Sequence, residues 1–427
     1  MNITSQTIYH VPDGTVSSTS ITLAGFDRNN QTKQYVLSDR SVAFVGSPGC
    51  GKTTQIFKVV DQLHWNPDGV TVVLDIKREY VKKCRPGDAV LSLYDIEGVP
   101  AGCQVRWSLM REAYLDSHPE VVLKEIAGMV YRNAIEHSEN KAFPEAAMLL
   151  FYALLLHIFK NSHGRLLSNK ELIKRILSVK QAEFVEMISK DEELAPVRAF
   201  LPDKLNVTSF GIMMEKQAML LETFLLDSNF FHDDSDFSIR EFIHEGRGRT
   251  LYLVFDTESR KSSQTIVRLL LDIAMKETLA GENIAATDRT RYNFVLDEYA
   301  YLPSGLEYLE MVKDVGRSKG IRIYAGFQNF SQLKKLYDGR VESAMNDIAG
   351  YGDIVVFKPH DQATREMVLS RAGTEQAEMT TIDLLCNVHT ECRELPVVPP
   401  EVLNALDCGE AVILPNVGRP FWFRFME

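Results

Sequence analysis

The sequence is poor in cysteine, in net positive charge and in long hydrophobic runs. Its 427 residues include six cysteines, and no two of them form a C-x-x-C pair. A disulfide framework and a zinc site are therefore not indicated, and reduced thiols in a cytosol are expected. The chain has 47 Lys and Arg against 58 Asp and Glu, a formal net charge of -11. This balance argues against a generally basic coat for nucleic acid, although it allows a local basic surface.

Segments that direct a protein to a membrane are also scarce. Residues 1–13 lack the basic and apolar regions of a secretory signal. The longest apolar run, Ala146–Phe159, is short for a bilayer span and follows Pro144, a residue favoured in the first turn of a helix. We expect this run to be a buried helix, and we expect no intrinsic membrane span.

A glycine-rich stretch, GSPGCGKTT, carries the strongest chemical signal. Its spacing is G-x-x-x-x-G-K-T, in which glycines let backbone N–H groups turn onto phosphate oxygens. The apolar run Ser41–Val45 precedes it and a helical pattern follows, as binding of an anion at a helix N-terminus requires. We predict that the nucleotide contacts Gly46, Ser47, Pro48, Gly49, Cys50, Gly51, Lys52, Thr53 and Thr54. Lys52 is expected on the outer phosphates and the Thr53 hydroxyl on Mg²⁺.

A second acidic motif, YNFVLDEYAYL, is expected to complete the site. Its apolar strand ends at Asp297 and Glu298, and ligands of open α/β sheets collect at the carboxyl ends of strands. Asp297 is expected to support the metal and Glu298 to activate water. Because an adjacent Asp-Glu pair favours hydrolysis over binding alone, we predict an ATPase that uses ATP and Mg²⁺.

The segment GRSKGIRIYAGFQNF adds two candidates. Gln328 follows the apolar run Ile321–Phe327, so its amide is expected near Asp297 and Glu298. A glutamine there can sense the γ-phosphate or position water. Arg317 lies on the preceding loop and is either a surface residue or an arginine finger that reaches the nucleotide of a neighbouring subunit.

The same region is locally basic. Residues 313–340 contain seven lysines and arginines against two aspartates. A solvated helix face explains such a cluster. In a ring of subunits, the cluster can instead face a central pore and contact the phosphates of DNA without reading its bases.

The order of patterns along the chain predicts an α/β fold. Continuous β-branched runs separated by helices indicate a mainly parallel sheet with helices on both faces. Between about Arg111 and Asp236 the apolar residues recur instead at threes and fours, which indicates helices. We therefore predict a nucleotide-binding domain of residues 1–110 and 237–427, interrupted by an inserted all-α domain of residues 111–236. The predicted strands are Val70–Asp75, Thr250–Phe255, Tyr292–Leu296, Ile321–Phe327, Asp353–Phe357 and Ala411–Leu414.

The ordered motifs resemble a known family. GSPGCGKTT, VVLDIKREY, GDAVLSLYDIEGVPAGCQVRWSL, a helical insertion, DFSIREFI, FVLDEYAYL and GRSKGIRIYAGFQNFSQL follow one another as in the type IV secretion coupling proteins of the TraD and TrwB group. These are ring-forming ATPases related to the FtsK and HerA DNA pumps. The resemblance extends from about Ile21 to Phe425.

This resemblance implies a RecA-like P-loop NTPase domain and a hexamer that delivers DNA, with relaxase, to a secretion channel in conjugation. It places Lys52 and Thr53 on the nucleotide and the metal, and Asp297 and Glu298 in hydrolysis. It further implies that Gln328 has the sensing role and that Arg317 is the finger acting in trans.

The resemblance also implies partners and a location. The all-α domain is expected to meet the relaxosome, relaxase or effector proteins. Members of the family usually begin with a transmembrane segment, whereas none is expected here, so the chain is expected in the cytoplasm and recruited to the inner face of the membrane. In DIKREY, Arg78 stands where glycine is common in the family.

Two other functions remain open at this point. One is an ATPase receptor that docks secreted protein substrates on residues 111–236. The other is a DNA-processing motor of the HerA or FtsK type that works without a secretion channel.

Overall fold

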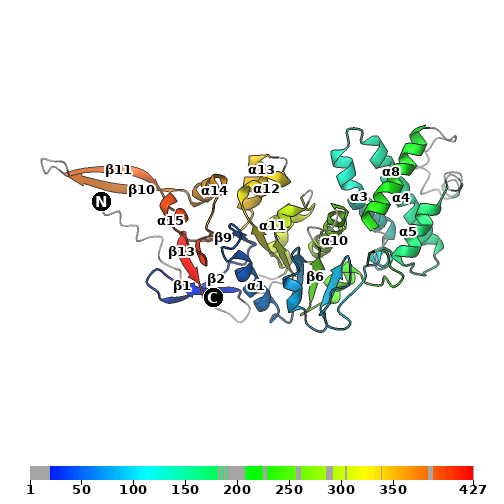
Figure 1. Cartoon of the computed structure of the whole chain (residues 1–427), viewed down its shortest axis with the longest axis horizontal. Coiled ribbons are helices and arrows are strands. Elements are labelled where there is room, and N and C mark those ends of the chain that lie inside the picture. Colours follow the sequence, from blue (N-terminus) through cyan, green and yellow to red (C-terminus); the bar gives the residue numbers. More distant parts are fainter. Residues whose placement is uncertain are drawn as a thin grey trace. The chain divides into compact units, whose positions relative to one another are not determined.

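The computed structural model shows two compact units along the chain (Figure 1). It describes residues 20–180, 183, 186, 190, 207–224, 228–255, 261–284, 292–302, 305–337, 339–382 and 388–426. Unit 1 comprises Met1–Leu74, Glu282–Tyr301 and Leu309–Glu427. Unit 2 comprises Asp75–Gly281 and Leu302–Tyr308.

A mixed sheet forms the centre of unit 1, in the order β2-β1-β13-β12-β9-β3-β8-β7-β4. Strands β9, β3, β8, β7 and β4 are parallel neighbours. The remaining strands continue the sheet from β9 in antiparallel pairs. The bounds are β1 (Thr22–Phe26), β2 (Thr32–Val36), β3 (Val42–Val45), β4 (Val70–Asp75), β7 (Tyr292–Asp297), β8 (Ile321–Phe327), β9 (Asp353–Phe357), β12 (Glu410–Leu414) and β13 (Phe421–Phe425).

Burial explains the two halves of this sheet. Every residue of β3, β4 and β8 is buried, as expected for parallel strands covered on both faces. In β1, by contrast, half-buried and buried residues alternate, which is typical of a strand with one covered face. The predicted α/β fold with a mainly parallel central sheet is confirmed, and the antiparallel extension was not predicted.

Helix α1 (Lys52–Leu63) packs against β3, β7 and β8 through Ile56, Val59, Val60 and Leu63. The other helices of unit 1 are α11 (Leu309–Val315), α12 (Phe330–Leu336), α13 (Val341–Ala349), α14 (Gln362–Ala372) and α15 (Pro400–Asn404), with the short turns η4 (Tyr299–Tyr301) and η5 (Gly316–Lys319). Strands β10 (Thr374–Ile382) and β11 (Val388–Pro396) form a separate antiparallel hairpin, which extends as an arm in Figure 1.

Unit 2 is mostly helical. In the described part of this unit, strands β5 (Ala89–Ser92) and β6 (Thr250–Val254) form a parallel pair. The predicted all-α segment, residues 111–236, contains α3, α4, α5 and α8, and the compact unit around them also includes both strands and α10. The remaining bounds are η2 (Tyr80–Lys83), α2 (Leu109–Tyr114), α3 (Pro119–His137), α4 (Ala142–Asn161), α5 (Asn169–Ser178), α8 (Val207–Phe224), α9 (Ile239–Glu245) and α10 (Lys261–Ala280).

Helix α4 contains the longest apolar run of the sequence. Among the described residues, one helix, α4, is long and apolar enough to cross a membrane, judged by length and composition alone. A helix in the core of a globular protein can have the same length and composition. In unit 2, α4 packs against α3 and α8 and buries Leu150, Phe151 and Leu154, as a core helix does.

Candidate nucleotide site

The glycine-rich loop connects the end of β3 to the first residue of α1. Gly49 and Gly51 have φ angles of 78° and 100°, a backbone region that glycine enters without steric cost. At Gly46 the restriction is space, because an added Cβ would lie 2.6 Å from Phe357 Cβ and 2.9 Å from Cys50 Sγ. The loop therefore has the shape of a phosphate cradle, and this shape depends on all three glycines.

Lys52 and Asp297, which are 245 positions apart, form a buried ion pair with Nζ to Oδ1 at 2.7 Å. The Thr53 hydroxyl donates to Asp297 Oδ2 at 3.3 Å. Lys52 is 4% exposed and Asp297 is 5% exposed. The structure thus brings together one ammonium, one hydroxyl and one carboxylate at the N-terminus of α1. Hydroxyl and carboxylate oxygens are ligands that Mg²⁺ prefers.

Gly326 on β8, which was not among the predicted site residues, makes this arrangement possible. An added Cβ would lie 2.1 Å from Asp297 Oδ1 and 3.1 Å from Ile56 Cδ1. The carbonyl of Gly326 also accepts a hydrogen bond from the Glu298 N–H at 2.9 Å. The only signal in the sequence is a glycine inside an apolar strand, a pattern that often marks close approach of another group.

Glu298 is 5% exposed and its backbone is left-handed, with a φ of 61°. Such a conformation costs energy for a residue with a side chain and is found most often at functional sites. The Gln328 amide Nε2 donates to Glu298 Oε1 at 3.0 Å and to the Tyr301 hydroxyl at 3.1 Å. The predicted neighbours Glu298 and Gln328 are therefore in direct contact.

A buried polar group anchors the turn after Glu298. The Tyr299 hydroxyl donates to Asp347 Oδ2 at 2.8 Å, and the Lys313 ammonium pairs with the same carboxylate. Burial raises the pKa of Tyr299 and lowers the pKa of Lys313 to about 8. Because these groups have partners inside unit 1, they fix the backbone that carries Glu298.

Arg317 lies apart from the other predicted site residues of its own chain. Its Nη2 and Nε lie 2.6 Å and 2.7 Å from Asp39 Oδ2, and both side chains are more than half exposed. Exposed ion pairs of this kind contribute little to stability, so the guanidinium can exchange partners readily.

The basic segment is smaller at the surface than the sequence suggested. Lys313 and Arg322 are buried, and Arg322 Nε donates to the Arg40 carbonyl at 2.9 Å. Their burial corrects the prediction that all seven cations are available to DNA. The cations that reach the surface are Arg317, Lys319, Lys334, Lys335 and Arg340. Asp338, which the sequence analysis counted in this segment, lies outside the described residues.

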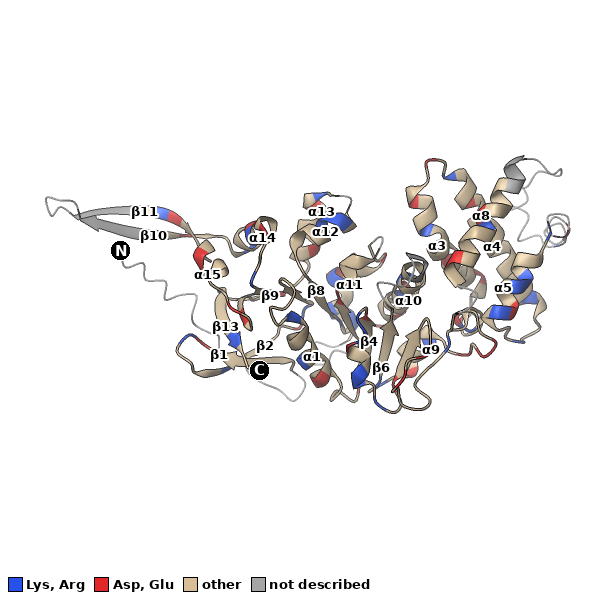
Figure 2. Cartoon of the chain, viewed as in Figure 1, with Lys and Arg blue, Asp and Glu red and all other residues tan. Residues whose placement is uncertain are grey.

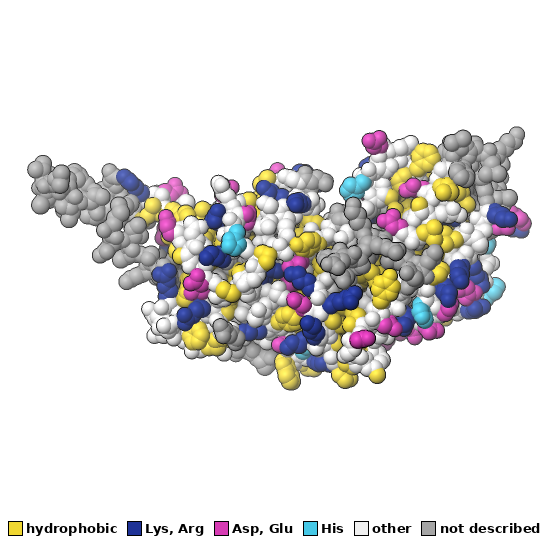
Figure 3. Space-filling model, viewed as in Figure 1, with side chains coloured by type: hydrophobic (Ala, Val, Ile, Leu, Met, Phe, Trp, Pro, Cys, Tyr) yellow, Lys and Arg dark blue, Asp and Glu magenta, His cyan; other side chains and the backbone are white. Residues whose placement is uncertain are grey.

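The surface cations of this segment include the lysines of α12, which are blue in Figure 2. On the face shown in Figure 3, Lys and Arg side chains are interspersed with Asp and Glu. A contact with nucleic acid is therefore expected to be local.

A loop near the end of the chain braces the phosphate cradle, and nothing in the sequence indicated it. The Gly409 N–H donates to the Cys50 carbonyl at 3.1 Å, and Cys408 Sγ donates to the Gly49 carbonyl at 3.2 Å. The Gly409 carbonyl in turn accepts from the Phe425 N–H at 2.8 Å. These bonds occupy the carbonyl groups of Gly49 and Cys50 and so fix the backbone of the loop.

In the DIKREY motif of unit 2, Asp75 is fully buried and accepts hydrogen bonds from the N–H groups of Glu79 at 2.9 Å and Val81 at 2.8 Å. Burial raises the pKa of this carboxyl group. Arg78 has a φ of 55°, a conformation that glycine adopts at less cost. Arg78 therefore has a left-handed backbone at the position where the sequence comparison expected glycine.

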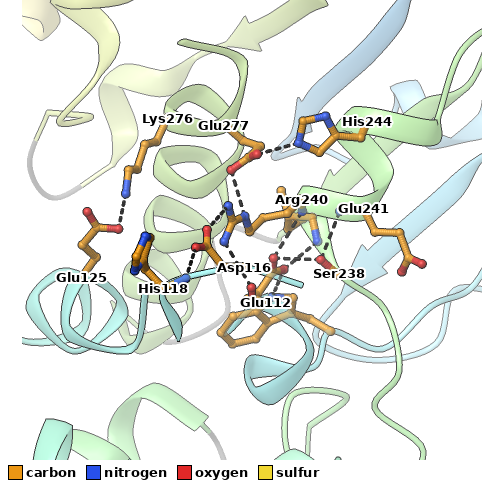
Figure 4. Close-up of polar contacts among 12 residues, drawn as sticks. Glu112, Asp116, His118, Glu125, Ser238, Arg240, Glu241, His244, Lys276 and Glu277 are labelled. Atoms are coloured by element: carbon orange, nitrogen blue, oxygen red, sulfur yellow. Dashed lines mark hydrogen bonds and ion pairs between the residues drawn. The ribbon is translucent and has the colours of Figure 1, made fainter. Parts of the chain in front are cut away.

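A second polar cluster lies in unit 2, where Figure 4 shows Arg240 between Asp116 and Glu277. Arg240 Nη2 is 2.5 Å from Asp116 Oδ2, and its Nε donates to Glu277 Oε2 at 2.9 Å. Glu112, fully buried, accepts from the Trp107 indole and from the backbone at the start of α9. Burial raises the pKa of Glu112. The cluster caps α9 and ties it to α2 and α10, which is a structural role.

Residues 34–390 match the model of the type IV secretion-system coupling protein DNA-binding domain. The chain belongs to this family. The chain is similar to the probable conjugal transfer protein TraG of Sinorhizobium fredii (strain NBRC 101917 / NGR234), with 24% identity over 196 residues. That match covers 40% of this chain and 30% of the relative, so it spans less than a third of the relative's length.

Solved structures show the fold of the coupling protein. The bacterial conjugative coupling protein TrwB in its unbound form has a TM-score of 0.71 at 18% identity, over 91% of this chain and 85% of that one. TrwB in complex with ADP and Mg²⁺ has a TM-score of 0.69 at 19% identity, over 91% and 86%. VirB4 of Thermoanaerobacter pseudethanolicus has a TM-score of 0.54 at 13% identity, over 97% and 98%.

Proposed function

We propose that this coupling protein is an ATPase that moves DNA, with its attached relaxase, toward a type IV secretion channel during conjugation. The observation that carries the proposal is the buried contact of Lys52 and Thr53 with Asp297 beside a glycine cradle. Support comes from TrwB, a structurally similar protein that has been solved with ADP and Mg²⁺ and with a non-hydrolysable ATP analogue.

The side chains present fit ATP and Mg²⁺. The backbone N–H groups of residues 51–54 would hold the phosphates, since the left-handed Gly49 and Gly51 turn the loop and the bonds from Cys408 and Gly409 hold its carbonyls. Thr53 and Asp297 would hold the metal, which neutralises charge on the phosphates when bound. Lys52 would exchange Asp297 for the outer phosphates, so that nucleotide binding and release of the carboxylate occur together.

Hydrolysis requires a water molecule held in line with the outer phosphate. Glu298 would orient that water and accept its proton; the proposal is supported by its position one residue after Asp297 and by its contact with Gln328. Gln328 would report on the outer phosphate through the same contact. Arg317, which is exposed and pairs with the exposed Asp39, would act on the nucleotide of a neighbouring subunit in a hexamer.

The conjugative role rests on the family and on its named relatives. The surface cations of α12 and its surroundings would contact DNA phosphates without reading sequence. The helices of unit 2 would meet the relaxosome or effector proteins. We place the protein in the cytoplasm, recruited to the inner face of the membrane through the channel.

The test is ATP hydrolysis by size-separated oligomers, with and without single-stranded or duplex DNA, at several salt concentrations. The proposal predicts hydrolysis that DNA stimulates, with a stimulation that weakens as salt rises. Lys52→Ala is expected to abolish turnover, whereas Lys82→Ala, which alters an exposed lysine of η2, is expected to keep it. If DNA does not change the rate of hydrolysis and the protein does not retain DNA at low salt, the proposal that it moves DNA is contradicted.

A further inference from the structure

Three side chains of unit 1 form a closed hydrogen-bonded group beside Glu298. Gln328 Nε2 contacts both Glu298 Oε1 and the Tyr301 hydroxyl. Gln332 Nε2 donates to Gln328 Oε1 at 3.2 Å and to the Tyr301 hydroxyl at 3.4 Å. Gln332 Oε1 accepts from the backbone N–H of Gln328 at 3.2 Å. Tyr301 therefore contacts the same Gln328 nitrogen as Glu298, and Gln332 contacts the Gln328 oxygen.

The chemistry of the end groups fixes the direction of every bond in this group. A carboxylate only accepts, so the Gln328 atom that faces Glu298 must be its NH₂. Gln328 Oε1 then needs a donor, which must be the NH₂ of Gln332. The Gln328 backbone N–H only donates, and it therefore requires the carbonyl of Gln332, in agreement with that assignment.

Both amide NH₂ groups consequently face the Tyr301 oxygen. The phenol accepts two hydrogen bonds, and its own hydrogen has to point elsewhere. Tyr301 is 41% exposed, and its backbone N–H donates to the Glu298 carbonyl at 3.0 Å. The hydroxyl thus holds two amide groups at once, and it belongs to the same short turn, η4, as the residue that follows Glu298.

We propose that Tyr301 and Gln332 are positioning residues for hydrolysis, which hold the Gln328 amide against the Glu298 carboxylate. This inference rests on the proposed ATPase activity. Neither side chain acts on the nucleotide itself. Their contribution is to lock the rotamer of Gln328, so that Glu298 keeps one orientation toward the attacking water.

The test uses Tyr301→Phe and Gln332→Glu in the full chain, with ATP and DNA as in the wild-type assay. The phenylalanine lacks the shared acceptor, and the glutamate keeps an acceptor for the Gln328 N–H but has no NH₂ for Gln328 Oε1. A lost hydrogen bond of ordinary strength corresponds to about a tenfold effect on rate. Each variant is expected to lower kcat by about tenfold and to leave KM for ATP and nucleotide affinity unchanged.

Tyr114→Phe is the matched control, since Tyr114 of unit 2 is 52% exposed and is expected to keep full turnover after the same loss of a hydroxyl. A double-mutant cycle separates positioning from a general structural role. If Tyr301 acts through Gln328, then Tyr301→Phe has no further effect on kcat in a Gln328→Ala background. If the effects of Tyr301→Phe and Gln328→Ala on kcat instead add in the double variant, the proposal is contradicted.

The outcomes distinguish this inference from the proposed function. Wild-type turnover that Lys52→Ala abolishes, with Tyr301→Phe equal to wild type, overturns the inference alone. A wild-type chain without turnover overturns both. A fall in nucleotide affinity equal to the fall in kcat also overturns the inference, because a group that positions only the hydrolytic side chains does not alter nucleotide binding.

Discussion

Asp297 and Gly326 face each other on the neighbouring strands β7 and β8, so closely that a Cβ on Gly326 would fall 2.1 Å from Asp297 Oδ1. The carboxylate that pairs with Lys52 occupies the space that any other residue at 326 would fill. The position of the predicted metal ligand, Asp297, therefore depends on the absence of a side chain on the next strand.

Gly326→Ala is expected to displace the Asp297 side chain and to weaken Mg²⁺-dependent ATP binding by about tenfold or more, since the backbone of β8 offers no room to relax. The measurement is ATP affinity in the presence of Mg²⁺. Gly128→Ala in α3 is the matched control, because the atom nearest to its added Cβ is Met148 Sδ at 4.0 Å. Equal affinities for the two variants contradict the prediction.

Glu298→Gln is expected to bind ATP as tightly as the wild type and to hydrolyse it at least about 10²-fold more slowly, because an amide is a poor proton acceptor. Single-turnover assays and nucleotide retention on a desalting column measure the two effects. Glu401→Gln, a change at an exposed position of α15, is the control and should behave as wild type. Wild-type turnover by Glu298→Gln removes the catalytic assignment.

Arg317→Ala is expected to lower turnover by about 10³ to 10⁵ in the assembled protein, the usual effect of removing an arginine finger. Asp39→Ala separates this role from the ion pair, because it removes the partner and leaves the guanidinium. We expect Asp39→Ala to keep turnover near the wild-type value. If both variants lose turnover alike, the ion pair itself is what matters, and the finger assignment is wrong.

Asp272 on α10 predicts a pH dependence of stability. Burial raises the pKa of its carboxyl group to about 7, although Arg268 and the Glu307 N–H act in the opposite direction. Between about pH 4 and pH 7 the folded protein keeps a proton that the unfolded chain has released. The contribution of this group to the free energy of unfolding is therefore full at low pH and is lost as the pH rises through about 7.

Asp272→Asn removes that titration. The free energy of unfolding of the variant, relative to wild type, is expected to rise by a few kcal/mol between about pH 4 and pH 8. Denaturant unfolding at both pH values measures it. Asp314→Asn, at an exposed position, is the control and should follow the wild-type pH dependence. Parallel pH curves for Asp272→Asn and wild type contradict the prediction.

The sequence predicted those parts of the site that local pattern encodes. The glycine spacing located the cradle. The apolar run before this loop and the apolar run that ends at Asp297 placed Lys52 and Asp297 at the carboxyl edge of one parallel sheet. Gln328 was predicted for the same reason, since it follows β8 directly. The roles of Glu298, Gln328 and Arg317 remain predictions.

Other features depend on which elements become neighbours, and no local pattern encodes that. The antiparallel strands beside β9, the brace from Gly409 and the contact of Tyr301 with Gln332 all join segments that the sequence gives no reason to pair. Burial of Lys313 was missed for a related reason. A lysine in a basic stretch is predicted to be exposed unless its buried partner, here Asp347, is known.

The most direct test of the account is ATP affinity of wild type and Asp297→Asn with and without Mg²⁺, with Asp314→Asn as control. The account holds that the ammonium, the hydroxyl and this carboxylate surround one metal-bound nucleotide. It predicts that Mg²⁺ tightens ATP binding to wild type and to Asp314→Asn, and that Asp297→Asn loses most of this gain. An undiminished Mg²⁺ effect in Asp297→Asn would contradict it.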